Sequence, residues 1–318
     1  MDLFKKKVQR KSMVAEKKIS FKLRFMKSWQ LYIMLIPAVI YFVVFNYMPM
    51  YGIQIAFKDY KITQGITGSS WVGLKHFEQF FDTFYFKRLI SNTMILNLYG
   101  LLFSFPIPVI LAIFLNYIRK DKMKRFIQTT IYIPHFISTT VLAGMLYVFL
   151  SPSGGIFNVV RMAMGLDAVE YMSEASAFRT IFIGSGIWQG AGYGTILYIA
   201  SLAGVDPNLY EAAEIDGANI WQKIRYIDIP SVMGTVVISF ILQCGNMLDS
   251  NTTKALLLQT VGNITKSEIL GVYVYNMGIE GGHFSYTAAI GLFVNVVNFI
   301  FILLANKISK TVSNSSLF

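Results

Sequence analysis

Two apolar stretches of the sequence carry polar and aromatic side chains suited to holding a solute rich in hydroxyl groups. Such solutes, sugars among them, present both C–H faces and hydroxyls, so their sites combine aromatic rings with amides and hydroxyls. The run 188–194 supplies an indole, an amide, a phenol and three glycines that could loosen a helix and free backbone groups. Within 231–249, an acid and two amides recur at helical spacing and would share one face. The candidate substrate pathway is therefore Trp188, Gln189, Tyr193, Gln243, Asn246 and Asp249.

The same residue types also fit a purely structural role. Polar side chains in membrane helices form hydrogen bonds with neighbouring helices, and glycines let two helix backbones approach closely. The sequence leaves both interpretations of these residues open.

Other chemistries lack the residues they need. No G-x-x-x-x-G-K-[ST] sequence occurs, so any ATP that drives this chain must be hydrolysed by another subunit. The histidines, His76, His135 and His283, have no metal-ligand spacing, and the single cysteine, Cys244, lies inside an apolar stretch. The cores of the apolar stretches contain no Asp, Glu, Lys or Arg, which ion-gradient transporters usually place at membrane depth. We therefore expect a chain that is not an enzyme and binds no metal or cofactor of its own.

The elements that must position the candidate residues are membrane-spanning helices. Of the 318 residues, 54% are hydrophobic and only 14% are charged, and the mean hydropathy is +0.52. The apolar residues fall in blocks of roughly 20, the length that a helix needs to cross the hydrocarbon core. The prediction is an all-α polytopic membrane bundle of six transmembrane helices, with prolines that kink some of them. The six blocks are 31–57, 91–117, 127–150, 180–203, 231–249 and 285–306.

Basic residues set the expected orientation. Ten of the 28 lysines and arginines lie in the first 28 residues, and further clusters lie at 119–125, within 204–230 and after residue 306. Because cytoplasmic loops are enriched in Lys and Arg, both termini are predicted to be cytoplasmic. The net charge of +11 then reflects contact with membrane lipid, and no nucleic-acid partner is expected.

The predicted topology divides the chain into four segments. They are a basic cytoplasmic tail, the first span with an outer loop, the main transmembrane domain and a short cytoplasmic tail: 1–28, 29–90, 91–307 and 308–318. The two remaining outer loops are predicted to carry short helices, over 156–165 and 267–277.

The inner segment 204–230 is predicted to be an ordered helix–turn–helix. Asp206 provides an N-cap that is followed by a proline, and acids placed early in the helix suit its positive N-terminal end. Gly217 permits a turn or a close backbone approach, and Pro230 opens the next span. A connecting loop with this much ordered structure on the cytoplasmic face is typical of a docking element.

The run Glu211-Ala212-Ala213, then Gly217, then Ile227-Asp228-Ile229-Pro230 resembles the EAA motif of ABC importer permeases. The family form is EAA, three residues, Gly, nine residues and I-x-L-P, and the spacing matches throughout, with Ile229 in place of Leu. The resemblance implies the type I ABC importer permease fold and a cytoplasmic coupling helix, 207–229, that sits in a groove of the ATPase subunit. The residues implied to make or shape that contact are Glu211, Ala212, Ala213, Asp216, Gly217, Ile227 and Pro230.

Four further stretches resemble the sugar permeases of the oligosaccharide and polysaccharide importer branch: 49–52, 56–60, 71–77 and 132–138. This resemblance implies a subunit of the bacterial inner membrane that works with a second homologous permease. It also implies two ATPase subunits and an extracytoplasmic sugar-binding protein as partners. ATP and magnesium would be used by the ATPase subunits and not bound by this chain.

Two other functions are compatible with the sequence. The EAA motif is shared by importer permeases for peptides, amino acids and glycerol-phosphate, so only the four further stretches favour a sugar. A polytopic receptor or channel subunit without an ATPase is the alternative from another class. In that case Trp221, Ile224 and Ile227 would face lipid or another copy of the chain.

Overall fold

The computed structural model describes residues 28–313 and contains two compact units, the first ending at Gln54 and the second beginning at Ile55. In the first unit, an apolar helix runs through Pro37 without ending there. Its elements are α3 (Trp29–Phe42), the π-helix η1 (Val43–Tyr47) and the start of the 3-10 helix η2 (Met48–Phe57). Nearly all of the predicted basic tail, and the last five residues, lie outside the described residues.

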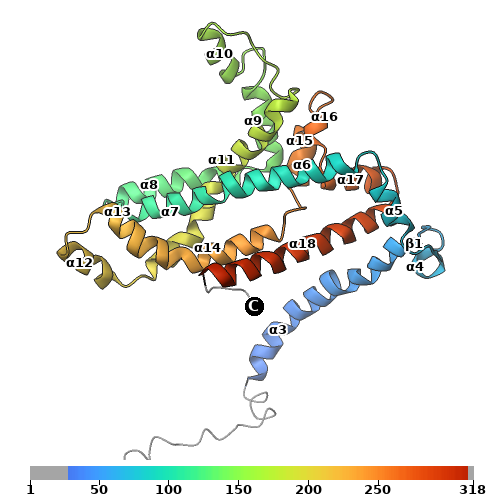
Figure 1. The fold of residues 1–318 in the computed structure, drawn as a ribbon, viewed down its shortest axis with the longest axis horizontal. Helices are drawn as coiled ribbons and strands as arrows, with labels where there is room; N and C mark the ends of the chain where they lie inside the picture. Colours follow the sequence, from blue (N-terminus) through green and yellow to red (C-terminus); the bar gives the residue numbers. More distant parts are fainter. Residues whose placement is uncertain (1–27, 314–318) are drawn as a thin grey trace, which may run out of the picture. The chain divides into compact units, whose positions relative to one another are not determined.

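Long helical segments form the body of the second unit (Figure 1). One of them is continuous from Phe86 to Asn116, and it packs against α11 through its second half, α7. α14 packs against both α11 and α18. The bounds are α6 (Phe86–Tyr99), the π-helix η3 (Gly100–Ser104), α7 (Pro106–Asn116), α11 (Ala175–Ala203), α14 (Ile229–Cys244) and α18 (Phe284–Ser313).

The π-helix η3 has a local cause in the proline that follows it. Pro106 has no backbone N–H, so the bond that an α-helix would direct to the carbonyl of Leu102 is absent. The N–H of Phe105 bonds to the carbonyl of Gly100 at 3.0 Å, one residue further back than in an α-helix. Widened turns of this kind are frequent at functional sites, and both ends of η3 line the pockets described below.

The predicted third span, 127–150, is broken and not merely kinked. Its pieces are α8 (Asp121–Tyr132), the 3-10 helix η4 (Ile133–Phe136) and α9 (Thr139–Phe149). Pro134 lies at the break, and the two halves meet at 97°. The hydroxyl of Ser138 accepts a hydrogen bond of 3.2 Å from the N–H of Val141 and so caps the start of α9. The sequence predicts a kinked helix here, and the structure instead has two separate helices that meet almost at a right angle.

Among the described residues, four helical segments are long and apolar enough to cross a membrane, and the bent α8–α9 pair makes five if it counts as one span. They are Trp29–Phe57, Phe86–Asn116, Ile220–Cys244 and Phe284–Thr311. α11 is 29 residues long but is not among them, because its glycines, serines and glutamine lower its hydropathy. The count of six therefore stays a prediction.

Short elements occupy the segments between the long helices. β1 and β2 form a two-stranded antiparallel sheet in which Lys58 pairs with Trp71, so the prediction of a purely α-helical chain misses one small sheet. The helices predicted over 156–165 and 267–277 are confirmed by α10 and by α17 with η6. The bounds are β1 (Lys58–Asp59), α4 (Gly65–Gly68), β2 (Ser70–Trp71), α5 (Lys75–Phe81), α10 (Ile156–Ala163), α15 (Thr252–Leu258), α16 (Ile264–Ser267), α17 (Leu270–Tyr275) and the π-helix η6 (Asn276–Glu280).

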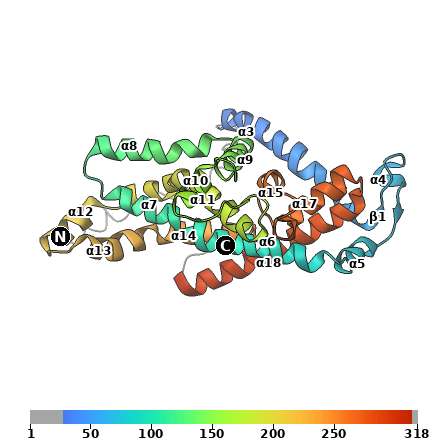
Figure 2. The same ribbon diagram turned by 90° about the horizontal axis from the view of Figure 1, so that it is seen from above.

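The EAA segment and the segment predicted to be the first outer loop lie at opposite ends of the second unit. Figures 1 and 2 both place α12 (Pro207–Ile215) and α13 (Ile220–Lys223) at one end, and α5 with β1 at the other. Next to α13, side chains from α7, α11, η5 (Ile224–Asp228) and α14 form a buried apolar cluster. Its members are Ile113, Leu202, Ile224 and Val232. Close packing of this kind holds helices together in lipid, where water provides no hydrophobic driving force.

Candidate functional site

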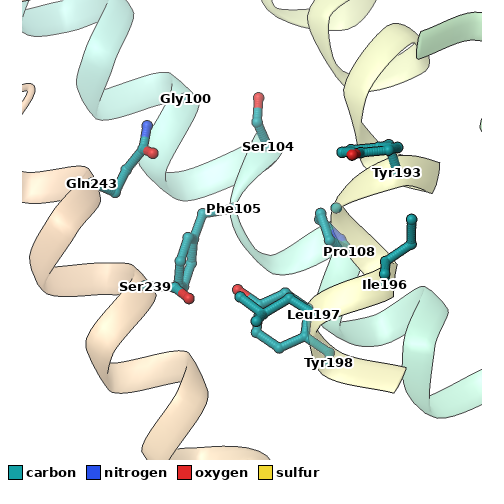
Figure 3. A pocket seen from close by; sticks show the side chains of 11 residues that line it. Gly100, Ser104, Phe105, Pro108, Tyr193, Ile196, Leu197, Tyr198, Ser239 and Gln243 are labelled. Atoms are coloured by element: carbon teal, nitrogen blue, oxygen red, sulfur yellow. The ribbon is translucent and has the colours of Figure 1, made fainter. Parts of the chain in front are cut away.

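One pocket of about 520 Å³ lies between η3 with α7, α11 and α14, and we call it the aromatic pocket. Figure 3 shows Gln243 and Tyr193 on opposite sides of it, with Ser104 between them. Phe105 and Tyr198 add ring faces to its lining. The pocket therefore combines apolar ring faces with hydroxyl and amide groups, which is the combination that a sugar requires.

A second pocket of about 540 Å³ shares Gly100, Ser104 and Gln243 with the first, so the two adjoin. We call it the amide pocket because carboxamide side chains line it from four elements of the chain: Asn97, Gln189, Gln243 and Asn251. The Nε2 of Gln189 donates a hydrogen bond of 2.7 Å to the carbonyl of Ile137, which holds α11 beside the break between η4 and α9. Its Oε1 makes no hydrogen bond to the described residues and can accept one from a solute.

Tyr193 has a ring partner that the sequence did not indicate. His135 of η4 stacks on it, with ring centroids 3.9 Å apart and an angle of 5° between the ring planes. His135 lines the amide pocket and Tyr193 lines the aromatic pocket, so this stack stands where the two pockets meet. The phenol ring is thereby held in place while 45% of the residue stays exposed.

Two of the three glycines of the 188–194 run, Gly192 and Gly194, are packing positions, and the predicted loosening of the helix is wrong. α11 continues unbroken through all of them. A Cβ added at Gly192 would lie 1.9 Å from the carbonyl oxygen of Ile131 on α8, and one at Gly194 would lie 3.0 Å from Pro108 on α7. These glycines let α11 approach α8 and α7 closely, which is the structural interpretation that the sequence left open.

The remaining candidate pathway residues are not brought together. α14 ends at Cys244, so of the three residues predicted to share one helical face only Gln243 lies in the helix. Asn246 and Asp249 follow in turns, and the Nδ2 of Asn246 donates to the carbonyl of Leu242 at 3.2 Å. Neither residue lines the two pockets, and neither does Trp188. The prediction of a single polar face over 243–249 is therefore wrong.

The EAA loop, residues 206–230, is ordered by local hydrogen bonds. The carboxylate of Asp206 accepts from the N–H of Asn208 at 3.0 Å and caps α12. At the other end Gly217 has φ +73°, which an L side chain rarely adopts. The N–H of Gly217 bonds to the carbonyl of Glu214 at 3.0 Å, and that of Ala218 to Ala213 at 2.8 Å, which is the Schellman pattern.

A second turn of helix follows and joins the next span. Asn219 and Gln222 form a reciprocal capping box that starts α13. The π-helix η5 then leads into α14, and Ile229 donates its N–H to the carbonyl of Ile224 just before Pro230. The helix–turn–helix predicted from the sequence is thus present in the structure.

A buried acid holds this loop to the transmembrane helices. Asp228 has no exposed surface, and its two carboxylate oxygens accept hydrogen bonds from Tyr117 at 2.6 Å and from Tyr210 at 2.5 Å. Burial, reinforced by the bond to Asp228, raises the pKa of Tyr210 to about 12. Lys223 pairs with Glu214 at 2.6 Å and so links α13 back to α12. We had not predicted a role for Asp228, although an acid between two isoleucines next to a span was a signal for one.

The residues implied to contact an ATPase lie mostly on the outside of this loop. Glu211, Ala212, Asp216, Gly217 and Pro230 are exposed, whereas Ala213 and Ile227 are half-buried.

Apolar side chains of the EAA loop are also exposed. Ile215 is 87% exposed and Trp221 is 70% exposed, while Ile224 is buried in the apolar cluster. Trp221 and Ile224 therefore face different ways. The receptor or channel alternative would have Trp221, Ile224 and Ile227 all face lipid or another copy of the chain, and the buried Ile224 does neither. Exposed large apolar side chains beside exposed acids fit a surface that binds another protein.

Comparison with known proteins gives the family. A family model described as the binding-protein-dependent transport system inner membrane component matches residues 100–314. Protein LplB of Bacillus subtilis (strain 168) is 39% identical over 318 residues, which cover 100% of both chains. The polygalacturonan/rhamnogalacturonan transport system permease protein YteP of the same strain is 39% identical over 295 residues, covering 93% of this chain and 92% of that one.

Solved structures show the same fold. A crystal structure of a bacterial ABC transporter involved in the import of the acidic polysaccharide alginate contains a chain with a TM-score of 0.83 and 35% identity, covering 91% of this chain and 98% of that one. In the alginate transporter in complex with an alginate pentasaccharide-bound periplasmic protein, the TM-score is 0.85 at 34% identity, with 94% and 100% covered. The type I ABC importer permease fold implied by the EAA motif is thereby confirmed. This chain belongs to the family of binding-protein-dependent transport system inner membrane components, and it is a multi-pass permease of an ABC importer.

Proposed function

We propose that this permease forms half of the translocation pathway for an oligosaccharide and couples to a separate ATPase through the EAA loop. The observation that carries the proposal is the pair of adjoining pockets, where ring faces, amides and hydroxyls converge from η3, α11 and α14. Relatives support the solute class, because YteP is named for polygalacturonan and rhamnogalacturonan and the structural neighbours import alginate.

A second homologous permease supplies the other half of the pathway. Gln243 and Tyr193 are exposed in this chain on its own, although both belong to long helices of the membrane domain. Polar groups at that depth face a protein partner or a water-filled cavity and not lipid. A partner permease that covers α14 and α11 would turn the two open pockets into an enclosed pathway.

An extracytoplasmic binding protein delivers the sugar to the outer loops. The structural neighbour was solved with a pentasaccharide-bound periplasmic protein, which supports this partner. In this topology the binding protein docks at the end of the chain that carries α5 and β1, opposite the EAA loop (Figure 2). Both chain termini then lie in the cytoplasm.

ATP acts through the EAA loop. Two ATPase subunits bind ATP and magnesium, and closure of that pair pushes on α12 through Glu211, Ala212, Asp216 and Gly217. Asp228 and the apolar cluster fix the loop to α7, α11 and α14, so the push moves the helices that line the pockets as a body. Rigid-body motion of this kind rocks the two permeases between inward-open and outward-open states. This chain performs no catalysis.

Copurification tests the proposal. The chain is purified from its native membrane in mild detergent beside a Glu211→Arg variant, and the bound proteins are identified by mass spectrometry. We expect an ABC ATPase and a second EAA-bearing permease with the natural chain, and loss of the ATPase alone with the variant. Glu174→Arg is the matched control, since Glu174 is an exposed acid of an outer loop.

Two outcomes would contradict the proposal. If the natural chain comes down without any ATPase, coupling of this permease to a separate ATPase is contradicted. If Glu211→Arg and Glu174→Arg both retain the ATPase, the ATPase does not dock at the EAA loop.

A further inference from the structure

One lysine of the amide pocket is buried without a counter-ion. Lys254 on α15 is 4% exposed, although lysine is almost never fully buried unless it is paired. Its ammonium donates a hydrogen bond of 2.7 Å to the carbonyl of Phe182 and lies 4.9 Å from the centroid of that ring. The ion pairs among the described residues join Arg88 to Glu268 and Lys223 to Glu214, so no carboxylate balances Lys254.

The chain leaves room for this ammonium beside the pocket. A Cβ added at Gly186 of α11 would lie 3.3 Å from the Nζ of Lys254, so the missing side chain is what opens the space. Lys254 lines the amide pocket together with Asn97, Gln189 and Asn251, and the lining contains no Asp or Glu.

Several donors of this pocket have no acceptor among the described residues. An ammonium has three N–H donors, and the carbonyl of Phe182 takes one of them. The Oδ1 of Asn251 accepts from the backbone of Lys254, which leaves its amide N–H groups without a partner among the described residues. Burial in this pocket, whose lining holds no carboxylate, lowers the pKa of Lys254 to about 8.

We propose that Lys254 is a specificity residue that pairs with a carboxylate of an acidic, uronate-containing oligosaccharide as it passes through the amide pocket. The inference rests on the proposed function and adds the substrate class to it. A single ammonium matches the single charge of one uronate carboxylate, and the neighbouring amides match its ring hydroxyls. The pair forms only while the sugar is present, so the sugar is held during passage and is then released.

Lys254 has a competing structural role, which is to tie α15 to α11 through the carbonyl of Phe182. Two substitutions separate the roles. Lys254→Gln keeps an N–H donor and removes the charge, whereas Lys254→Arg keeps the charge. Lys266→Gln removes the same charge from an exposed position on α16 and serves as the control.

The experiment measures ATP-driven uptake by the complete importer in proteoliposomes, with its binding protein present. The probes are oligosaccharide digests of pectin and alginate, which are acidic, and of arabinan and galactan, which are neutral. We expect uptake of an acidic digest, a loss of about tenfold or more with Lys254→Gln, and near-natural uptake with Lys254→Arg and Lys266→Gln. Complex yield should be the same in all variants.

Each other outcome has a defined meaning. Uptake of only neutral digests, or natural uptake of an acidic digest by Lys254→Gln, overturns the inference and leaves the proposed function standing. Equal losses in Lys254→Gln and Lys254→Arg, or a lower complex yield in Lys254→Gln, assign Lys254 the structural role and overturn the inference as well. Uptake of no digest by the natural complex contradicts oligosaccharide import itself.

Discussion

Tyr210 on α12 donates a 2.5 Å hydrogen bond to the same buried carboxylate, Asp228, that accepts from Tyr117 at the end of α7. One side chain thus joins the EAA loop, the segment that enters α14 and the helix that borders the aromatic pocket. A force applied to α12 therefore reaches the pocket helices through hydrogen bonds as well as through packing.

Removing this acid should uncouple the loop from the transmembrane helices. Asp228→Ala leaves the hydroxyls of Tyr117 and Tyr210 without their acceptor, at a cost of about 1–3 kcal/mol for a buried donor. We expect a lower melting temperature of the purified complex and fewer sugar molecules imported per ATP hydrolysed. Asp167→Ala, at an exposed outer-loop acid, is the control. An unchanged import-to-hydrolysis ratio in Asp228→Ala would show that coupling does not pass through this carboxylate.

Close packing of α11 on α8 can be tested with two glycines of one helix. Gly192→Ala places a Cβ 1.9 Å from the carbonyl oxygen of Ile131, so the helices must move apart, with a cost of about 1–3 kcal/mol for overpacking. Gly190→Ala makes the same change where nothing lies within 4 Å. Thermal unfolding in detergent should show a clear loss only for Gly192→Ala. Equal melting temperatures of the two variants would mean that this contact is looser than described.

A side chain at Gly217, the left-handed residue of the EAA loop, should disturb the turn between α12 and α13. Gly217 has φ +73°, and an L residue there costs about 1–2 kcal/mol. Gly217→Ala should loosen the turn between α12 and α13 and weaken copurification of the ATPase. Gly234→Ala on α14, where a Cβ meets nothing within 4 Å, should leave copurification unchanged. Retention of the ATPase by both variants would show that docking tolerates a distorted turn.

Alanine substitutions of two nearby amides, Gln243 and Asn246, test where the solute pathway runs. Gln243 lines both pockets, and its side-chain amide makes no hydrogen bond to the described residues, so that amide is available to a sugar. Asn246 bonds to the carbonyl of Leu242 and lines neither pocket. Gln243→Ala should reduce uptake about fivefold or more, since a hydrogen bond contributes about 1 kcal/mol, and Asn246→Ala should have little effect. The reverse order would place the pathway at the outer end of α14.

The charge of Lys254 should make acidic-sugar uptake depend on pH. Because burial lowers its pKa to about 8, the ammonium is present below that pH and is lost as the pH rises through it. Uptake of the acidic digest should therefore fall between pH 7 and 9 in the natural importer and stay level in Lys254→Arg, whose guanidinium remains charged. His135 also lines the pocket and is unchanged in the variant, so the comparison removes its contribution. Parallel profiles of the two proteins would contradict the assignment.

The EAA loop could be predicted from the sequence because its order is local. Asp206, Gly217 and the capping box act on residues within five positions of themselves, and the sequence shows such relationships directly. Most of the membrane spans could be predicted for the same reason, since each is a continuous apolar run.

The parts that could not be predicted depend on partners far away in the chain. Tyr117 and Asp228 are 111 positions apart, and Lys254 and Phe182 are 72 positions apart. The end of α14 was also missed. Gly245, the residue after α14, lies so close to Ile302 of α18 that a Cβ there would collide with it. Only the packed structure brings those atoms together.

The π-helix η3 has a consequence for how relatives of this chain can vary. An α-helix advances about 100° per residue, so the extra residue in η3 rotates the whole of α7 by that amount relative to α6. Deleting one residue between Gly100 and Ser104 would turn Pro108, Ile113 and the rest of α7 away from α11 and η5. Single-residue gaps should therefore be rarer here in related sequences than in the neighbouring loops, even where the amino acids themselves differ. The angular phase of the helix, and not the identity of its side chains, is what this segment preserves.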